Sequence, residues 1–503
     1  MEIVSPRRAV IDIGSNSVRL VIFEGPARAP IAVFNEKSLC GLGDREPDSG
    51  ALRETSMADA LKILRRFASI LADENLASLK VIATAASREA PNGPDFLSEI
   101  RRIGFEPTLL TGEEEAKLAA FGILSGAPEV MEEEGGCLAG DMGGGSLELS
   151  HLDRGAPDGV ADLVSLPIGG LRLASRYEGN LRDAKKAVNA AIADVPWLKG
   201  LEPTTFYIVG GAWRALGRLA IMQTGHPISI LDHFWLPAER AIELCRLVEQ
   251  QSVESLASTP GVPSRRAPTL PFAAMVLRKI VSKSGAKRVA ISSCGVREGS
   301  LYAELSPEER AEDPLVALSQ HYAERLSPGG MERRRAIFDF LSPAFANETS
   351  RQARLRRAAA KLTNVAGLFH PDSRGNEAAV SVLNMPFISV DHPGRVALAA
   401  ILFQRHTASE ADFPAHLHTQ LLDDDTLRWT RQVGLGLRFA SDFDPVGRTV
   451  LPRARLSADQ DTLRLELERG DRDYLGDSPR RRFEKFAGSL GLAPKVSSGA
   501  DWL

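Results

Sequence analysis

Two glycine-containing turns in the first third of the chain have the composition of phosphate-binding loops. The first is Gly14-Ser15-Asn16-Ser17, and the second is Gly143-Gly144-Gly145-Ser146. A turn of this kind can direct several consecutive backbone N–H groups into one concave surface, where they bind phosphate oxygens without a charged side chain. One such turn alone could equally be only a tight connection between two strands. Two copies of one design in the same chain favour phosphate binding.

Carboxylates stand close to both turns. Asp12 precedes Gly14, Asp141 precedes Gly143, and Glu148 follows the second turn. A carboxylate repels a phosphate a few Å away by several kcal/mol unless a cation lies between them. Mg²⁺ takes one or two carboxylates together with phosphate oxygens and water. The sequence therefore predicts Mg²⁺, or another divalent cation, held by Asp141 and Glu148 with a contribution from Asp12.

Three consecutive acids, Glu113, Glu114 and Glu115, open a segment with helical periodicity. Acids at a helix N-terminus are stabilised by the helix dipole, and this explanation is sufficient for Glu113. One of the other two could instead face the space between the two turns and deprotonate a water molecule as a general base. Spacing alone does not choose between Glu114 and Glu115.

Several other positions are candidates for contacts with phosphate. Arg88 follows a buried strand, where a guanidinium could clamp a phosphate or simply form a surface ion pair. Arg266 is a weaker candidate of the same kind, and Arg19 lies in the strand after the first turn. Gly210 and Gly211 end another apolar strand.

The elements around these residues indicate a duplicated α/β fold. Apolar strands at 9–13 and 18–23 flank the first turn, and strands at 137–139 and 147–152 flank the second. The two hairpins repeat one pattern. Further strands that lead into helices are predicted at 79–83, 107–110, 206–209 and 288–291.

The remainder of the chain has a different character. Residues 306 to about 424 are rich in Ala, Leu and Arg with helical periodicity, which predicts an all-helical domain. Alternation at 434–440 and 462–468 predicts strands of a small α+β unit. Three arginine clusters after residue 305 could line the path of a polyanion, although a solvated surface also explains them: Arg333, Arg334, Arg335; Arg351, Arg354, Arg356, Arg357; Arg480, Arg481, Arg482.

Composition limits the classes of protein that remain. The chain has 503 residues, of which 44% are hydrophobic and 25% charged, as in soluble globular proteins with several domains. No apolar run approaches the ~18 residues of a membrane span, and the start of the chain lacks an apolar signal core, so we expect a cytoplasmic protein. A net charge of -4 argues against nucleic acid as partner. The four cysteines are too scattered for a zinc site or a disulfide framework.

Seven segments occur in the order found in one known family. They are IDIGSNSVRLVIFE, ATAASREAPN, LLTGEEEAKLAAFGI, GDMGGGSLEL, VSLPIGGLRL, VPSRRAP and CGVREGSLY. The chain resembles, over roughly its first 300 residues, the exopolyphosphatase and guanosine pentaphosphate phosphatase (Ppx/GppA) family of the actin, sugar kinase and heat-shock ATPase superfamily. The resemblance implies an α/β fold of two ribonuclease-H-like domains, 1–125 and 126–305, with the active site between them.

The resemblance also implies roles for individual residues. The family's catalytic glutamate corresponds to Glu115, and Asp141 and Glu148 correspond to acids that help hold the cation and the phosphate chain. Thr111 replaces the serine of many members and keeps the hydroxyl. The sequence 211–213, Gly-Ala-Trp, replaces a Ser/Thr-Gly-Thr loop, which removes a hydroxyl contact to phosphate.

Beyond residue 305, the chain is similar to the long members of that family. The implied domains are a helical one at 306–425, related to metal-dependent HD phosphohydrolases, and a small α+β one at 426–503. An HD hydrolase needs an adjacent His-Asp pair, and the sequence contains none. Five histidines are therefore expected to be structural or to contact a polyanion: His370, His392, His406, His416 and His418.

The implied reaction is Mg²⁺-dependent, processive hydrolysis of the terminal phosphoanhydride of inorganic polyphosphate. The motifs do not distinguish this substrate from guanosine pentaphosphate or tetraphosphate. Two functions of different classes also compete with this interpretation: a kinase of the same superfamily, and a non-enzymatic sensor of polyphosphate or an alarmone. The complete set of acids disfavours the sensor. A homodimer is the family expectation.

Overall fold

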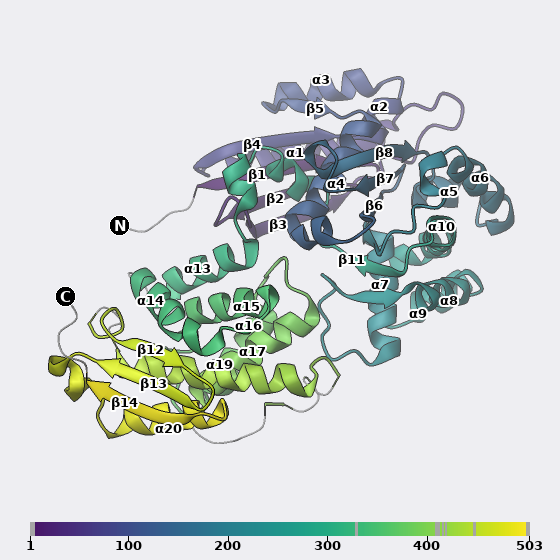
Figure 1. Ribbon diagram of the computed structural model, residues 1–503. Coiled ribbons are helices and arrows are strands. Elements are labelled where there is room, and N and C mark those ends of the chain that lie inside the picture. Colours follow the sequence, from purple (N-terminus) through teal and green to yellow (C-terminus); the bar gives the residue numbers. More distant parts are fainter. Residues whose placement is uncertain are drawn as a thin grey trace. The chain divides into compact units, whose positions relative to one another are not determined.

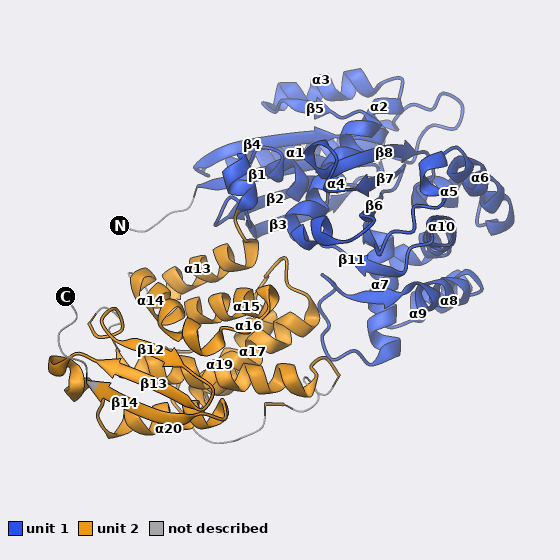
Figure 2. Ribbon diagram, viewed as in Figure 1, with its two compact units in different colours: residues 1–311 blue, residues 312–503 orange. Residues whose placement is uncertain are grey.

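The computed structural model describes residues 6–326, 330–407, 413–414, 417, 420–445 and 449–498. The chain forms two compact units, residues 1–311 and residues 312–503 (Figure 2). His416 and His418 lie outside the described residues. Among the helices of the described part, none has the length and apolar character needed to cross a bilayer.

The first unit contains two sheets of related topology (Figure 1). The first sheet has the order β3-β2-β1-β4-β5. Its strands are β1 (Arg7–Ile13), β2 (Ser17–Glu24), β3 (Ile31–Leu39), β4 (Leu76–Ala83) and β5 (Pro107–Leu109). The β1, β2 and β3 strands pair antiparallel, whereas β1, β4 and β5 pair parallel.

The second sheet repeats this arrangement and adds one edge strand. Its order is β10-β11-β9-β6-β7-β8. Its strands are β6 (Cys137–Met142), β7 (Leu147–Leu152), β8 (Val160–Leu166), β9 (Thr205–Val209), β10 (Trp235–Pro237) and β11 (Arg288–Ile291). Here β6, β7 and β8 pair antiparallel, and β6, β9 and β11 pair parallel. The predicted internal duplication and the α/β class are confirmed.

The central strands are buried because helices cover the sheets. Ala9, Val10 and Ile11 have no exposed surface, which explains the unbroken apolar run in β1. The helices of this unit are α1 (Glu54–Leu71), α2 (Ala85–Glu89), α3 (Gly93–Ile103), α4 (Gly112–Gly126), α5 (Gly170–Arg176), α6 (Leu181–Ala193), α7 (Gly211–Thr224), α8 (Ala238–Glu249), α9 (Val253–Ser258), α10 (Leu270–Ser284), α11 (Val296–Tyr302) and α12 (Pro307–Ala311).

The second unit combines helices with a small sheet. Its sheet has the order β12-β13-β14, with strands Arg455–Ala458, Thr462–Leu467 and Ala493–Ser498. The predicted strand at 462–468 is therefore confirmed. The helices are α13 (Pro314–Leu326), α14 (Met331–Leu341), α15 (Ser350–Lys361), α16 (Arg374–Asn384), α17 (His392–His406), α19 (Asp424–Phe443) and α20 (Asp477–Ser489).

The predicted strand at 434–440 is wrong, because this segment lies inside α19. Its alternating glycines mark places where neighbouring helices come close. A Cβ atom at Gly434 would lie 2.7 Å from the carbonyl oxygen of Ile401, and one at Gly436 would lie 3.1 Å from the ring of Phe486. The α19 helix also crosses position 425, so the helical region extends farther than expected.

Candidate active site

The two glycine turns have the same internal geometry. The amide of Gly14 donates to the carbonyl of Ser17 at 3.1 Å, and the amide of Gly143 donates to the carbonyl of Ser146 at 3.0 Å. The first turn joins β1 to β2, and the second joins β6 to β7. The resemblance seen in the sequence is therefore a resemblance in structure.

The carbonyl groups of the second turn accept hydrogen bonds from backbone amides at the start of α5. The amides of Gly170 and Leu171, at the start of that helix, donate to the carbonyls of Gly143 and Gly144 at 3.2 and 3.0 Å. The amide of Gly169 donates to the carbonyl of Gly145 at 3.3 Å. These bonds fix the turn and use the carbonyl oxygens of all three glycines as acceptors.

The first turn is held in the same way by the loop after β3. The amide of Gly43 donates to the carbonyl of Ser15 at 2.6 Å, and the amide of Cys40 donates to the carbonyl of Asn16 at 3.2 Å. In the described part of the chain, the amides at 15, 16, 144 and 145 donate no hydrogen bond. A row of such donors is the geometry that binds phosphate oxygens.

The two turns face each other across a short gap. A Cβ atom placed on Gly145 would lie 2.9 Å from the hydroxyl oxygen of Ser15, and one on Gly144 would lie 3.3 Å from its Cβ. A cavity of about 160 Å³ lies beside them. Most of the residues singled out in the sequence line it: Asp12, Gly14, Ser15, Asn16, Ser17, Arg19, Glu115, Asp141, Gly143, Gly144, Gly145, Ser146, Gly210, Gly211 and Arg266.

The start of α4 distinguishes between the two candidate glutamates. Glu114 is occupied with capping, because its Oε2 accepts from the amide of Thr111 at 2.7 Å while the Thr111 hydroxyl accepts from the Glu114 amide at 3.2 Å. Glu114 is exposed, whereas Glu115 is only 8% exposed and lines the cavity. The hydroxyl at position 111 therefore serves the helix end.

Close packing against α11 fixes the position of α4. A Cβ atom at Gly122 would lie 2.2 Å from the carbonyl oxygen of Gly295, and one at Gly299 would lie 1.8 Å from that of Leu118. Only glycine fits at both positions. The two helices thus approach backbone to backbone, which holds Glu115 in a defined place.

The pKa of Glu115 is raised to about 7, chiefly by burial, with Arg88 opposing the rise and the negative charges of Asp141 and Asp12 adding to it. Nη1 of Arg88 lies 3.4 Å from Oε2 of Glu115 and donates to the carbonyl of Leu110 at 2.7 Å. Arg88 is not among the residues that line the cavity. A carboxyl group with a pKa near neutrality is suited to accept a proton from water.

The other acids are placed at different depths. Asp12 Oδ2 accepts from Nη1 of Arg297 at 3.0 Å. Burial raises the pKa of Asp141 to about 6, opposed by nearby arginines. Glu148 is 2% exposed, does not line the cavity, and accepts from the hydroxyl of Ser165 at 2.9 Å. Burial, followed by the charge of Glu115, raises its pKa well above the usual range.

These acids supply the oxygen donors that Mg²⁺ prefers, and their mutual repulsion is the kind that a divalent cation relieves. The described residues contain no group of three His, Cys, Asp or Glu side chains arranged to hold an ion by themselves. One or two carboxylates with substrate oxygens and water are sufficient for Mg²⁺. The donor set therefore fits a cation shared with a phosphate ligand.

Three cationic side chains that line the cavity were not predicted from the sequence. They are Lys37, Arg214 and Arg297. Arg297 lies in one of the family segments, and Arg214 follows the Gly210-Gly211 pair, so both had a signal in the sequence. Lys37 belongs to the edge strand β3 and had none. Burial and the neighbouring Arg266, Arg19 and Arg214 lower the pKa of Lys37 to about 8.

Arg266 reaches the cavity over Gly211. A Cβ atom at Gly211 would lie 2.3 Å from Nη2 of Arg266, so glycine is required for this guanidinium position. Trp213 is fully buried and donates from Nε1 to the carbonyl of Ala273 at 2.9 Å. The Gly-Ala-Trp sequence thus supplies a helix start and core packing.

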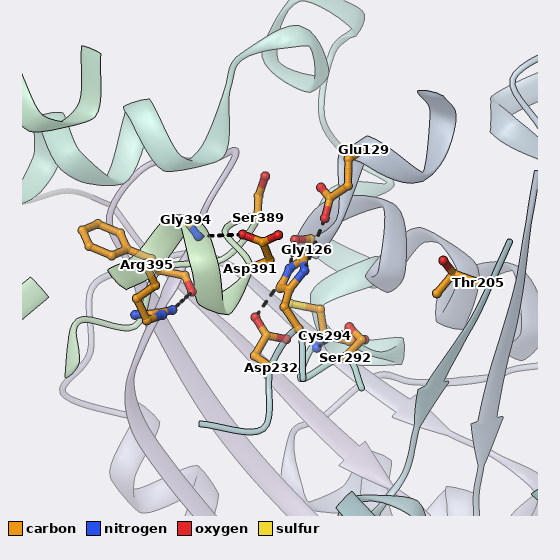
Figure 3. A network of polar contacts seen from close by, with 12 residues as sticks. Gly126, Glu129, Thr205, Asp232, Ser292, Cys294, Ser389, Asp391, Gly394 and Arg395 are labelled. Carbon is orange, nitrogen blue, oxygen red and sulfur yellow. Dashed lines mark hydrogen bonds and ion pairs between the residues drawn. The ribbon is translucent and has the colours of Figure 1, made fainter. Parts of the chain in front are cut away.

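A separate polar network anchors the other end of α4. The carbonyl of Gly126 lies 3.0 Å from Nε2 of His233, and Glu129 Oε1 lies 3.3 Å from its Nδ1. Asp232 accepts from the amide of Ser293 at 2.8 Å. Figure 3 shows Gly126, Glu129 and Asp232 grouped together, and none of them lines the cavity.

Comparisons with known proteins agree with this geometry. The Ppx/GppA phosphatase family matches residues 10–308, and the family described as exopolyphosphatase, C-terminal, matches residues 337–494. The guanosine-5'-triphosphate,3'-diphosphate pyrophosphatase of Aeromonas hydrophila is 26% identical over 504 residues, covering 95% of this chain and 96% of its own. Exopolyphosphatase 1 of Mycobacterium tuberculosis is 26% identical over 337 residues, covering 64% of this chain and 95% of its own.

A solved structure shows the same fold. The Aquifex aeolicus member of the Ppx/GppA family superimposes with a TM-score of 0.51 at 23% identity, covering 59% of this chain and 97% of its own. The family match spans more than half of the sequence and includes both glycine turns, Glu115 and the cations of the cavity. The chain therefore belongs to the Ppx/GppA phosphatase family.

Proposed function

We propose that the protein is an exopolyphosphatase that removes orthophosphate from the end of inorganic polyphosphate. The observation that carries this proposal is the position of Glu115, a buried carboxylate with a pKa near 7 in the wall of the cavity that both amide-donating turns also line. Such a site offers a general base beside an anion cradle, which is what hydrolysis of a phosphoanhydride requires.

In the proposed reaction, Glu115 accepts a proton from a water molecule as the water oxygen bonds to the terminal phosphorus. The bond from that phosphorus to the bridging oxygen breaks, and the shortened chain leaves with the bridging oxygen. Backbone amides of the turns at 14–17 and 143–146 position the phosphates, assisted by Gly210 and Gly211. Little else is needed, because positioning and electrostatics supply most of the catalysis of phosphoryl transfer.

Asp141 and Asp12 would hold Mg²⁺, which would neutralise charge on the phosphate oxygens. We propose that Glu148 supports this site indirectly, since it is buried beside Asp141, its partner in the paired strand. The sequence assigned Glu148 a direct contact with the cation. Its burial and its bond with Ser165 support an indirect one.

The cations of the cavity support a polyanionic substrate. They are Arg19, Lys37, Arg214, Arg266 and Arg297. Burial, together with the charges of Arg297 and Arg214, lowers the pKa of Arg19 to about 10. Like charges are held together here at a cost that an incoming chain of phosphates would offset. Arg88, by contrast, is proposed to orient Glu115 and not to contact phosphate.

Guanosine pentaphosphate is the second candidate substrate. The relative from Aeromonas hydrophila, whose name refers to a guanosine substrate, is similar to this chain over nearly its whole length. Release of orthophosphate from long polyphosphate, tripolyphosphate and guanosine pentaphosphate, compared at equal concentration with Mg²⁺, distinguishes the two. Faster release from the guanosine compound would reject the exopolyphosphatase assignment, and no release from any of them would favour a sensor.

We also propose that the chain has four domains, 1–125, 126–305, 306–443 and 444–503. The last boundary, predicted at 425, is moved to the end of α19 at Phe443. A homodimer is proposed from the family resemblance, and a cytoplasmic location from the sequence composition. Sedimentation analysis of the purified full chain tests the oligomeric state directly.

A further inference from the structure

A group of arginines in the second unit comes together from four helices. We call it the arginine cluster, and its members are Arg333 of α14, Arg405 of α17, Arg438 of α19 and Arg482 of α20. The charges of Arg438, Arg333 and Arg482 all act on Arg405. None of these arginines belongs to the catalytic cavity, whose lining residues all lie in the first unit.

Hydrogen bonds hold three of the four arginines through residues 441, 442 and Thr363. Nε of Arg405 donates to the hydroxyl of Thr363 at 3.1 Å, and that hydroxyl lies 3.4 Å from the hydroxyl of Ser441. Nη2 of Arg333 donates to the carbonyl of Ser441 at 3.4 Å. The next residue, Asp442, pairs with Nη1 of Arg482 at 2.9 Å. The guanidinium groups of Arg333 and Arg405 are therefore held by neutral groups, and that of Arg482 is held by an acid.

The carboxylates near the cluster do not balance its charge. Asp442 is shared between Arg482 and the hydroxyl of Ser478, which donates to it at 3.0 Å. Asp444 acts on Arg333, but its Oδ2 also accepts from three backbone amides at 2.9 to 3.1 Å. Within the described residues, Arg333, Arg405 and Arg438 form no ion pair closer than 4.0 Å.

Two donors of the cluster are buried without a hydrogen-bond partner in the described part of the chain. They are Nε of Arg333 and Nη1 of Arg438. His406, next to Arg405, also has a buried Nε2 without a partner, and burial together with the charge of Arg405 lowers its pKa to about 3. Burial and the neighbouring arginines lower the pKa of Arg405 to about 9. An unsatisfied buried charge is costly, and an anion with several oxygens would remove that cost.

We propose that the arginine cluster is a second anion site, which binds a phosphate group within the helical part of the second unit. Guanidinium groups present paired N–H donors that match the spacing of phosphate oxygens. Hydrogen bonds to Thr363 and Ser441 hold two of the four guanidiniums in place, so little side-chain entropy is lost on binding. The ligand is orthophosphate, the product of the proposed reaction, or a phosphate group of a longer chain.

The first test counts bound inorganic phosphate by equilibrium dialysis of the full-length protein. We expect two sites per chain in the unmodified protein. Arg438→Gln should lose one of them, whereas Arg214→Gln should lose the site in the catalytic cavity. Arg428→Gln is the matched control, because Arg428 lies on the same helix but is exposed and paired with Asp425. Two sites of unchanged affinity in Arg438→Gln would overturn the proposal.

The second test separates a binding role from a structural one through thermal unfolding. Without phosphate, Arg438→Gln should unfold at the same temperature as the unmodified protein or higher, because like-charge repulsion is relieved. With phosphate, its unfolding temperature should rise less, because ligand bound to the native state stabilises it. A lower unfolding temperature without phosphate, combined with a full rise on adding phosphate, would show that Arg438 is structural and would overturn the proposal.

The third test identifies the source of the phosphate group. In Arg214→Gln, only the arginine cluster should retain bound orthophosphate. Displacement of this orthophosphate by tripolyphosphate at a concentration at least tenfold lower than that of orthophosphate would assign the site to a polyphosphate chain. Displacement at equal or higher concentration would assign it to the free product. Failure of every phosphate compound to bind Arg214→Gln would overturn the proposal without affecting the proposed function of the first unit.

Discussion

Nη1 of Arg88 lies 3.4 Å from Oε2 of Glu115 and donates to the carbonyl of Leu110 at 2.7 Å. The guanidinium is therefore fixed by the strand end before α4 and holds the carboxylate at the start of that helix. It lowers the pKa of Glu115 against the larger effect of burial. Arg88 thus acts on the proposed base and not on the phosphate, and this difference can be tested.

Replacing Arg88 by Gln should move the pH dependence of hydrolysis. The proposed base must be deprotonated, so activity is expected above pH 7 and should decline as pH falls through the pKa of Glu115. Without the Arg88 charge that pKa should rise by about one unit. The acidic limb of kcat/KM against pH should shift upward by the same amount.

The control for this shift is Lys117→Gln. Lys117 lies on α4, the helix of Glu115, and its exposed charge is paired with Asp158 at 3.1 Å. The pH profile of Lys117→Gln should match that of the unmodified protein. Loss of substrate affinity in Arg88→Gln with an unmoved profile would instead assign Arg88 to phosphate binding.

Glu115→Gln should remove catalysis and preserve binding. The amide has nearly the same shape but cannot accept a proton from water, so kcat should fall by roughly 10² to 10⁴-fold. Affinity for polyphosphate, measured by titration calorimetry, should remain within a few-fold. Glu114→Gln serves as the comparison, since Glu114 caps the helix, and should affect stability more than kcat.

Because of Lys37, the affinity for polyphosphate is expected to depend on pH in the alkaline range. Its pKa of about 8 means that its charge disappears as pH rises through that value, while the arginines of the cavity remain charged. Affinity should therefore fall above pH 8. In Lys37→Arg this fall should be absent, because the guanidinium stays protonated. A persistent fall in Lys37→Arg would exclude Lys37 as its source.

Gly211→Ala should displace Arg266 without unfolding the protein. The new methyl group meets the mobile end of that side chain at 2.3 Å, and the backbone has no close contact there. We expect KM for polyphosphate to rise about tenfold, because a charge-assisted hydrogen bond contributes about 1.5 to 3 kcal/mol. Gly170→Ala is the control, since its methyl would find only ordinary contacts at 3.7 Å. Equal KM values in the two variants would contradict the proposed role of Arg266.

Much of the first unit could be predicted because its signals are local. The strands around both turns carry apolar runs or alternation, as in the buried centre of β1 and in β7, and the strand predicted at 288–291 has its observed bounds. Alternation was misleading in α19, since glycine at 434 and 436 reflects contacts with other helices that lie far away in sequence. Such contacts leave no period in a single sequence.

The candidate site was predicted where motif and chemistry coincide, and incompletely elsewhere. Glu115 could be chosen over Glu114 only through the family resemblance, and its burial then agreed with that choice. Lys37 was missed because an edge strand carries no signal for what lies opposite it. Glu148 was expected at the cation, but its depth depends on how β7 pairs with β8 and Ser165, which spacing does not encode.

The bonds that tie the carbonyls of Gly143, Gly144 and Gly145 to the start of α5 have a consequence for selectivity. With those acceptor oxygens permanently engaged, the loop presents only its positive dipole ends to whatever enters. Backbone amides therefore recognise the oxyanion, and a side-chain substitution does not readily remove this recognition. Changes of substrate within such a scaffold would have to arise from the surrounding basic side chains.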